Sequence, residues 1–350
     1  MDKMLVLAVA GSGKTESIIR GFIPGVRTLV LTYTKNAEED LRRRVLLRYG
    51  YMPSEIHIAT YFSFLVSFCA RPLLHAVMRD RGVTYSRPTE FSRRFRLVDD
   101  DRYFDSGRRL YHCRLAKLLM MRCMDELRHR VERYFDLVVV DEVQDFGGYD
   151  FNFLLDLSQA RVAWYLVGDF YQHTFDTSRD GSTNKQLHAD FAAYQQQFVG
   201  AGFRIDTNTL RGSYRCSQEV CAFIRDHIGV VIESANSKST QVEIVASRAA
   251  ASELHRDPGI LKLFYQQHHL YGCYSMNWGA SKGLDQCQDV CVVLNKSSWS
   301  NYRRAALASS APGTRNKLYV ASSRPHRNLY VLDESLIAPL DSTAARVVSG

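Results

Sequence analysis

A short stretch at residues 8–17, AVAGSGKTES, combines residue types that suit phosphate binding. Its glycines allow backbone N–H groups to turn toward an anion, Lys14 supplies a positive charge, and Thr15 offers a hydroxyl that can hold Mg²⁺. The usual pattern has glycine where this chain has Ala8. An apolar run precedes the stretch and a helix-compatible segment follows it, as such a loop requires. The stretch is therefore predicted to be a phosphate-binding loop that tolerates Ala8.

Two further stretches place polar side chains directly after apolar runs. In FDLVVVDEVQDF, Asp141 and Glu142 follow a run of valines. Adjacent carboxylates at the carboxyl end of a parallel strand suit a nucleotide enzyme, where one serves the metal and the other orients or deprotonates the attacking water. In VAWYLVGDFYQHTF, Gln172 follows Asp169 after a short turn, and an amide there can sense a terminal phosphate or its water. Together with the phosphate-binding loop, these stretches predict nucleotide chemistry.

Such side chains must be positioned by parallel strands that end at one edge of a sheet. Apolar runs of strand length occur at Met4–Ala8, Thr28–Tyr33, Ile56–Thr60, Leu137–Val140, Ala163–Val167, Val290–Leu294 and Leu329–Leu332. Helix-compatible segments lie between them, for example NAEEDLRRRVLLRYG, which Gly50 is expected to end. The alternation predicts an α/β protein with parallel sheets. A helical, basic segment at about 70–134 is expected to be an insertion, and the polar run 234–241 a loop.

Composition narrows the classes of protein. The formal net charge is +8, and residues 71–133 hold 16 Lys and Arg against 9 Asp and Glu, which favours a polyanionic partner. The eight cysteines include no C-x-x-C pair, so neither a zinc ribbon nor a disulfide framework is predicted. No apolar run reaches the roughly 18 residues of a membrane helix, and the opening residues are too few for a signal peptide. We expect a cytoplasmic protein with no membrane partner.

In order along the chain, these and further motifs resemble those of the UvrD/Rep group of superfamily one DNA helicases. AVAGSGKT resembles the group's phosphate loop, LTYTKNAEEDLRRRV the segment after its second strand, and ATYFSF its T-F-H-S-F element. DEVQD resembles its metal and catalytic-base motif, and VGDFYQHTF its G-D-x-x-Q-x-x-Y/F motif. SYRCSQEV resembles N-Y-R-S, GASKGLDQCQDVCVVL resembles K-G-L-E-F-x-V-V, and NKLYVASSRPHRNLYVL resembles Y-V-A-x-T-R-A. The shared order is more specific than any single match.

The resemblance implies a fold of two RecA-like P-loop NTPase domains with parallel sheets and a short helical insertion in the first. The first, ATP-binding domain is expected at 1–206 with the insertion at about 70–134, and the second at 207–350 without a large insertion. ATP and Mg²⁺ are the implied cofactors, bound in a cleft between the domains. Closure of such a cleft with ATP, and its opening with ADP, is how a protein of this kind steps along a strand.

The resemblance also assigns roles to residues. Nucleotide-binding residues are Ala10, Gly11, Ser12, Gly13, Lys14, Thr15, Glu16 and Asp285, the last through the ribose. Metal-binding residues are Thr15 and Asp141, and catalytic residues are Asp141, Glu142, Gln172, Arg215 and Arg324. DNA-binding residues are Thr32, Thr34, Thr60, Ser63 and Phe175, and Tyr33, Tyr61, Phe62 and Phe64 are further aromatic candidates for stacking on bases. The arginines make chemical sense, because guanidinium donors stabilise charge on a transferring phosphoryl group.

The chain departs from the group in three places. No glutamine motif for adenine precedes the phosphate loop, Asp285 replaces a glutamate, and Ser323-Arg324-Pro325 replaces Thr-Arg-Ala. We expect a single-stranded DNA translocase or helicase driven by ATP, moving 3′ to 5′ by resemblance, on single-stranded or partly duplex DNA. One alternative is a nucleotide- or DNA-sensing ATPase subunit that regulates a partner nuclease, as in phage defence. A weaker alternative is an RNA helicase.

Overall fold

The computed structural model describes residues 2–174, 180–337 and 339, which cluster into two compact units. The first unit holds most of the chain up to Asp206 and the second most of the chain from Thr207. Two short segments, Ala8–Gly13 and residues 169–174, belong to the second unit although the chain around them belongs to the first. The phosphate-binding loop is therefore divided, because the glycine-rich part lies in the second unit and Lys14 begins the next segment of the first.

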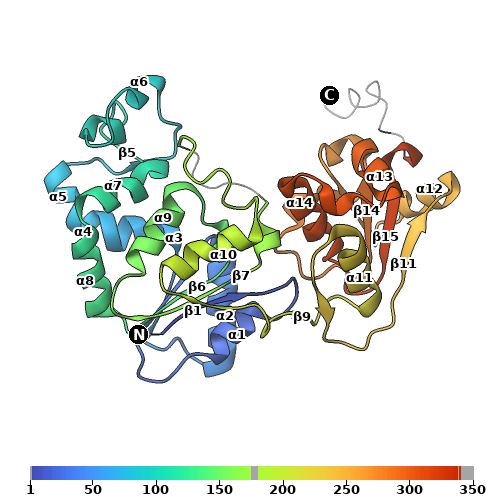
Figure 1. Ribbon diagram of the computed structural model, residues 1–350, viewed down its shortest axis with the longest axis horizontal. Coiled ribbons are helices and arrows are strands. Elements are labelled where there is room, and N and C mark those ends of the chain that lie inside the picture. Colours follow the sequence, from blue (N-terminus) through green and yellow to red (C-terminus); the bar gives the residue numbers. More distant parts are fainter. Residues whose placement is uncertain (1, 175–179, 338, 340–350) are drawn as a thin grey trace. The chain divides into compact units, whose positions relative to one another are not determined.

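The first unit is built on six parallel strands in the order β3-β2-β6-β7-β1-β8. Strand β2 is buried along its whole length, as a parallel strand covered on both faces should be. Figure 1 shows the helices that flank this sheet. The strands are β1 (Lys3–Leu7), β2 (Thr28–Thr32), β3 (Ile56–Thr60), β6 (Leu137–Val140), β7 (Ala163–Gly168) and β8 (Arg204–Asp206).

Helix α2 (Lys35–Tyr49) shows how local sequence sets the bounds of a helix. The Thr34 hydroxyl oxygen accepts a hydrogen bond from the Ala37 N–H at 3.2 Å, which satisfies one of the unpaired donors of the first turn. Gly50 ends the helix at φ 76°, in the left-handed region that glycine adopts without steric cost. The other helices of this unit outside the insertion are α1 (Lys14–Arg20), α3 (Tyr61–Ser63), α9 (Gly148–Leu157) and α10 (Phe191–Gly200), with a π-helix at Phe64–Ala70.

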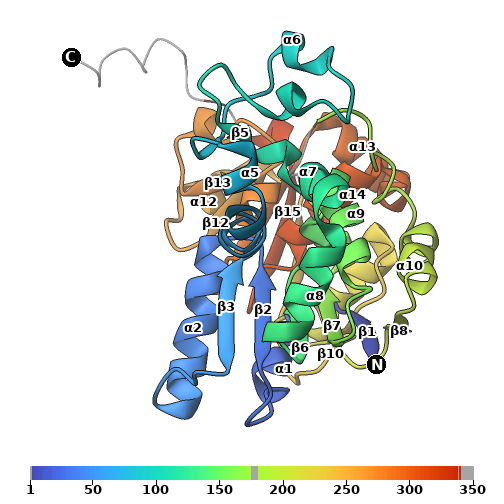
Figure 2. The ribbon, with the colours of Figure 1, turned by 90° about the vertical axis from the view of Figure 1, so that its left-hand side faces the viewer.

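The segment at about 70–134, where an insertion is predicted, is helical at both ends (Figure 2). Its helices are α4 (Arg71–Leu73), α5 (His75–Met78), α6 (Glu90–Arg93), α7 (Leu115–Arg122) and α8 (Met124–Tyr134). Its middle also contains two short parallel strands, β4 (Val83–Thr84) and β5 (Leu110–Tyr111), which were not predicted. Arg114, only 1% exposed, connects the insertion to the segment between β7 and α10, because its Nε donates to Asp180 Oδ2 at 2.6 Å.

The second unit is built on five parallel strands in the order β11-β15-β14-β12-β13. Alternate residues of β14 enter two separate cores: Val292 packs in one with Trp278, and Val293 in the other with Phe264. Both faces of the strand are therefore covered. The strands are β11 (Val242–Val245), β12 (Leu261–Phe264), β13 (Ser275–Asn277), β14 (Val290–Leu294) and β15 (Leu329–Asp333).

The remaining elements of the second unit are α11 (Gln218–Phe223), α12 (Arg248–Arg256), α13 (Lys296–Arg303), α14 (Pro312–Ser322), and a two-stranded parallel pair of β9 (Gly212–Ser213) with β10 (Glu233–Ser234). All seven predicted strands are confirmed within a residue or two, and so is the α/β class with parallel sheets. The strands that escaped prediction are short or carry polar residues, such as β12, which contains the buried Lys262. In the part of the chain described, no helix is long and apolar enough to cross a membrane.

Candidate functional site

The phosphate-binding loop depends on its glycines. Gly11 and Gly13 adopt φ angles of +70° and +82°, which side-chain-bearing residues rarely do. A Cβ atom at Gly11 would also lie 2.7 Å from the Cβ of Arg215 and 2.8 Å from the Ser213 hydroxyl oxygen. The loop and the segment that carries Arg215 therefore approach each other closely because one partner is glycine.

The polar groups of the loop divide into those that bind protein and those that do not. The Ala10 N–H donates to the Tyr319 hydroxyl oxygen at 2.9 Å, so it is already engaged. Across the described residues, no protein oxygen accepts from the N–H groups of Gly13, Lys14 or Thr15. The Ser12 hydroxyl is buried, with the residue 2% exposed, and it too has no hydrogen-bond partner among the residues described. Donors grouped in this way suit an anion that accepts several hydrogen bonds.

The predicted acidic pair follows β6 in the first unit. Asp141 is 4% exposed, and its Oδ1 accepts the Glu142 N–H at 2.9 Å. Glu142 lies in the left-handed region with φ 54° and ψ 46°, a conformation that costs a non-glycine residue on the order of 1–3 kcal/mol. The Gln144 side-chain amide donates to the Glu142 carboxylate and so orients it. Strain of this kind is found at sites where a side chain has a functional role.

Gln144 is itself accommodated by a glycine at the end of β7. A Cβ atom at Gly168 would lie 2.3 Å from Gln144 Oε1 and 3.0 Å from the Val143 backbone nitrogen. Gly168 thus leaves the space in which Gln144 reaches Glu142. Sequence reasoning assigned no role to Gln144, although its place inside DEVQD was a usable signal.

The order of the strands brings the two nucleotide motifs of the first unit to one edge of the sheet. Strands β1 and β6 flank β7, and all three are parallel. Neighbouring strands lie about 4.8 Å apart, so the carboxyl ends of β1 and β6 are roughly 10 Å apart. Lys14 and Thr15 follow the end of β1 after the loop, and Asp141 directly follows β6. Lys14 forms no ion pair with any carboxylate in the described chain.

Tyr319 joins the loop to the segment that carries Gln172, all within the second unit. Besides accepting from Ala10, the buried Tyr319 hydroxyl donates to Asp169 Oδ2 at 2.9 Å. The same carboxylate oxygen accepts from Gln172 Nε2 at 2.9 Å, and Oδ1 accepts from the Tyr171 N–H at 3.1 Å. Burial and then the Asp169 charge raise the pKa of Tyr319, which keeps its hydroxyl protonated as a donor. One hydroxyl thereby connects three predicted motifs.

Arg215 and Asp285, which the sequence assigned to phosphate and ribose, contact each other in the structure. Arg215 Nε donates to Asp285 Oδ1 at 2.8 Å, and its Nη1 donates to the Ser323 carbonyl at 3.2 Å. Burial would raise the pKa of Asp285, but Arg215 and then His326 outweigh it and the pKa lies below its ordinary value. The carboxylate therefore stays charged and holds the Arg215 side chain, which is 12% exposed.

Arg324 is buried with only neutral acceptors. The residue is 2% exposed, and its guanidinium donates to the Val320 carbonyl at 2.9 Å and to the Leu284 carbonyl at 3.1 Å. Burial, and then repulsion by Arg215, lowers its pKa to about 10. Within the described residues it pairs with no carboxylate. A buried cation in this state favours the arrival of an anion.

The residues predicted to bind DNA differ in their exposure. Thr34 and Ser63 are exposed, although Thr34 also caps α2. Thr60 is 6% exposed and donates its hydroxyl to Ser63 Oγ at 2.8 Å, while Thr32 is fully buried and its hydroxyl has no partner among the described residues. Phe175 lies outside the described residues. The two exposed hydroxyls are thus available to a large ligand, and Thr60 acts locally by positioning Ser63.

The aromatic candidates divide in the same way. Tyr61 and Phe64 are 3% and 2% exposed, and the Tyr61 hydroxyl donates to Asp150 Oδ1 at 3.1 Å, so both belong to the core. Tyr33 stacks on Tyr61 with ring centroids 6.2 Å apart. Tyr33 and Phe62 are both half-buried, but Tyr33 packs on the buried Tyr61, whereas Phe62 contacts the rings of Tyr85 and His112 in the insertion. Phe62 is therefore the better candidate for a contact with bases.

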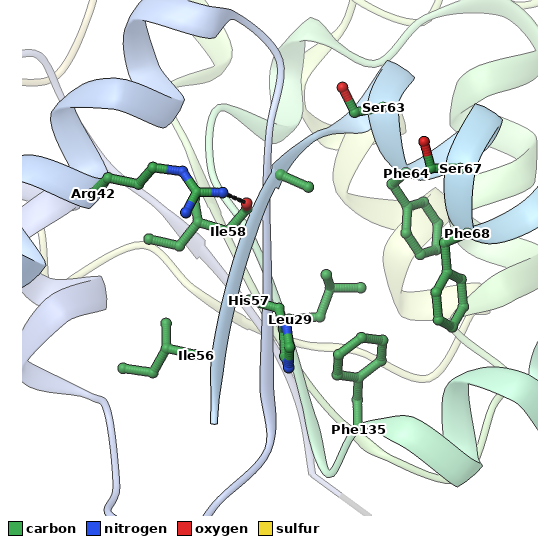
Figure 3. A pocket seen from close by; sticks show the side chains of 11 residues that line it. Leu29, Arg42, Ile56, His57, Ile58, Ser63, Phe64, Ser67, Phe68 and Phe135 are labelled. Carbon is green, nitrogen blue, oxygen red and sulfur yellow. Dashed lines mark hydrogen bonds between the residues drawn. The ribbon is translucent and has the colours of Figure 1, made fainter. Parts of the chain in front are cut away.

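A pocket of about 290 Å³ lies beside the edge strand β3, away from these motifs (Figure 3). Its lining is mainly apolar and includes the rings of Phe64, Phe68 and Phe135 together with His57. The guanidinium of Arg42, which also lines it, is bonded to the Ile58 carbonyl and so is not presented to a ligand. The pocket shares Ser63 and Phe64 with the residues predicted to contact DNA and contains none of the nucleotide-binding residues.

No protein-family profile matches this sequence, and no curated protein does. Among solved structures, the arterivirus nonstructural protein 10 helicase in complex with DNA is similar, with TM-score 0.50 and 13% identity over 98% of this chain and 62% of that one. A crystal structure of the arterivirus nonstructural protein 10 helicase is similar with TM-score 0.50 and 15% identity, over 95% of this chain and 62% of that one. The chain thus spans less than two thirds of their length. The fold of this chain is similar to that of these two helicase structures.

Sequence reasoning assigned no role to Tyr319 or Tyr214, although both contact the phosphate-binding loop in the structure. The ring of Tyr214 lies 3.9 Å from where a Gly13 Cβ would be, and this residue is 65% exposed. Its N–H donates to the Gly11 carbonyl at 2.9 Å, which fixes the aromatic residue beside the loop. Both tyrosines occur inside motifs that were identified, as the neighbour of Arg215 and within NKLYVASSR. An aromatic residue next to an arginine in a nucleotide motif was the available signal for Tyr214.

Proposed function

We propose that this protein is a UvrD/Rep-like superfamily one ATPase that couples hydrolysis of Mg-ATP to movement along single-stranded DNA, in the 3′ to 5′ direction. The observation that carries the proposal is the set of unengaged donors around Gly13, Lys14 and Thr15, with the buried Ser12 hydroxyl among them. The Ser12 hydroxyl is the buried member of this set, and a buried polar group without a partner is costly. A phosphate would satisfy these donors.

The residues at this edge fit Mg-ATP. In the proposal Lys14 and the loop N–H groups bind the phosphates, and Thr15 with Asp141 holds the metal. Glu142, which Gln144 orients, accepts the proton of the attacking water. Bound Mg-ATP supplies the phosphoryl group whose transfer to water releases the free energy for movement.

The arginines of the second unit complete the charge balance in this proposal. Arg215 lies against Gly11 of the loop and is hydrogen-bonded to Asp285. When phosphate binds, Arg215 would therefore exchange the Asp285 carboxylate for the phosphate as its anionic partner. Arg324 gains the anionic partner that its buried environment lacks. Because both donors stabilise charge that grows during phosphoryl transfer, their loss should lower kcat more than it raises KM.

We also propose that Tyr214 stacks on the base of the nucleotide. Its exposed ring beside Gly13 offers a flat apolar face next to the phosphate loop. Stacking of this kind accepts any purine, so ATP and GTP should be used with similar KM, and Tyr214→Ala should raise both KM values. A strong preference for ATP that survives Tyr214→Ala would exclude this part of the proposal.

The deciding experiment measures NTP hydrolysis with no nucleic acid, with single-stranded DNA and with RNA of the same sequence. We expect stimulation by DNA and its loss in Lys14→Ala, because the charge that reaches the phosphates is removed. Lys296→Ala, an exposed lysine at the start of α13, is the matched control and should keep full activity. Equal rates with and without nucleic acid, or an active Lys14→Ala, would reject the proposal. Unwinding of a forked duplex only after a partner protein is added would favour the nuclease-regulating alternative.

A further inference from the structure

Three aromatic rings meet on the insertion side of the first unit, and two of them, Tyr85 and His112, lie outside every motif described above. Phe62 lies on α3, Tyr85 follows β4, and His112 follows β5. The parallel register of β4 with β5 pairs the residues directly before Tyr85 and His112, and so sets these two rings side by side. Their centroids are 5.3 Å apart, and Phe62 lies 5.3 Å from Tyr85 and 6.2 Å from His112. We call these residues the aromatic cluster.

Two rings of the aromatic cluster, Phe62 and His112, are half-buried, and the third, Tyr85, is exposed to solvent. His112 Nδ1 is 3.2 Å from the Thr84 carbonyl oxygen, which fixes the imidazole. Tyr85 is 70% exposed although its ring contacts two others. A core role does not explain an aromatic side chain that contacts its neighbours and still exposes most of its surface, because burial of that surface would have stabilised the fold further. Exposed apolar surface of this kind marks an interaction site.

The charges around Tyr85 indicate what covers it. Arg81 lies just before β4 and Arg87 two residues after Tyr85, and both arginines are exposed. Neither forms an ion pair with a carboxylate among the described residues, whereas Arg96 and Arg109 of the same insertion do. Exposed arginines close in sequence to an exposed ring match a chain that alternates phosphates with bases. An acidic peptide would match the charge but would not need the ring face.

We propose that the aromatic cluster is a base-stacking site for single-stranded nucleic acid, with Tyr85 as the stacking ring and Arg81 and Arg87 as phosphate contacts. This inference rests on the proposed function in one respect, since Ser63, predicted to contact the backbone, is the next residue after Phe62. It goes beyond it by assigning a strand-binding role to the insertion through residues outside the motifs that predicted the nucleotide site. The platform tolerates any sequence, because every base has a face that can stack.

The test compares binding of a labelled oligothymidylate with binding of an abasic oligomer of the same length, by fluorescence anisotropy. Alanine substitution of a stacking ring weakens binding by about 5- to 140-fold per base. We expect Tyr85→Ala to lose affinity for oligothymidylate in this range while its affinity for the abasic oligomer stays that of the wild type. Tyr85→Phe, which keeps the ring, should bind both oligomers as the wild type does.

Tyr51→Ala is the matched control, because Tyr51 is 63% exposed, lies before β3 and has no ring partner in the described chain. It should bind both oligomers as the wild type does. Arg87→Gln should reduce the salt dependence of binding by about one phosphate contact.

The outcomes separate this inference from the proposed function. If the wild type binds oligothymidylate and Tyr85→Ala binds it with the same affinity, the base-stacking site alone is overturned. An equal loss of affinity of Tyr85→Ala for both oligomers also overturns it, because the substitution would then act through the fold. A wild type that binds no oligomer overturns the proposed function together with this inference. A wild type that binds an acidic peptide through Tyr85 and no oligomer has the same consequence.

Discussion

Removal of one hydroxyl, in Tyr319→Phe, tests whether the network around Ala10 and Asp169 stabilises the second unit. The hydroxyl accepts from the Ala10 N–H at 2.9 Å and donates to Asp169 at 2.9 Å, and all three residues are at most 1% exposed. A phenylalanine leaves the Ala10 N–H without its acceptor, at a cost of about 1–3 kcal/mol. Asp169 loses a charge-assisted bond worth a similar amount, but Gln172 and Tyr171 still donate to it. We therefore expect a loss of about 3 kcal/mol in the free energy of unfolding.

The assay is urea unfolding followed by intrinsic fluorescence. A Trp164→Phe background leaves Trp278 and Trp299, which both belong to the second unit, as reporters. Tyr302→Phe in the same unit is the control, because its ring packs on Trp299 but its hydroxyl has no hydrogen-bond partner in the described chain. The control should lose less than about 0.5 kcal/mol. If Tyr319→Phe loses no more than the control, the network contributes nothing and the reasoning is wrong.

Two further predictions concern ion pairs, one buried and one with an exposed arginine. Arg114→Met should lower the free energy of unfolding of the first unit by about 3 kcal/mol, because it leaves the buried Asp180 carboxylate without its main partner. This is the low end of the range for a broken buried pair, since Arg102 remains 3.7 Å from Asp180. Urea unfolding measures the loss, and recovery of stability in the double variant with Asp180→Leu would identify the uncompensated charge as its cause. The hydrogen bond from Arg327 lowers the pKa of Asp289, so its contribution to stability is complete above about pH 4 and is lost as the pH falls through the lowered value. Asp289→Asn should flatten the decline in unfolding free energy below pH 4, and an unchanged acid slope would contradict the assignment.

Much of the fold was predictable because its signals are local. Each run of buried β-rich residues became a parallel strand, and Thr34 and Gly50 set the ends of α2 by capping alone. Strands of a few residues, such as β4 and β9, carry too little pattern to stand out. They exist because tertiary neighbours supply their hydrogen bonds.

The candidate site was predictable in its parts but not in its connections. The glycines of the loop and the acidic pair after β6 follow from the residue types that phosphate and metal require. The chain alone could not show that Arg215 binds Asp285, because the two lie 70 residues apart and each has other partners available in sequence. It also gave no reason to expect that Thr32 is fully buried while Thr34 is exposed.

The sequence by itself therefore indicated which residues are candidates to hold phosphate, metal and water, since that prediction depends on chemical type and short spacing. Only the tertiary structure decided how those residues are held. The Ala10 N–H meets a hydroxyl 309 residues away, Gln144 reaches Glu142 because Gly168 leaves room, and Arg324 is enclosed among carbonyl oxygens. Such partners are selected by packing among distant segments, and a side chain takes the partner that the packed interior brings within hydrogen-bond distance.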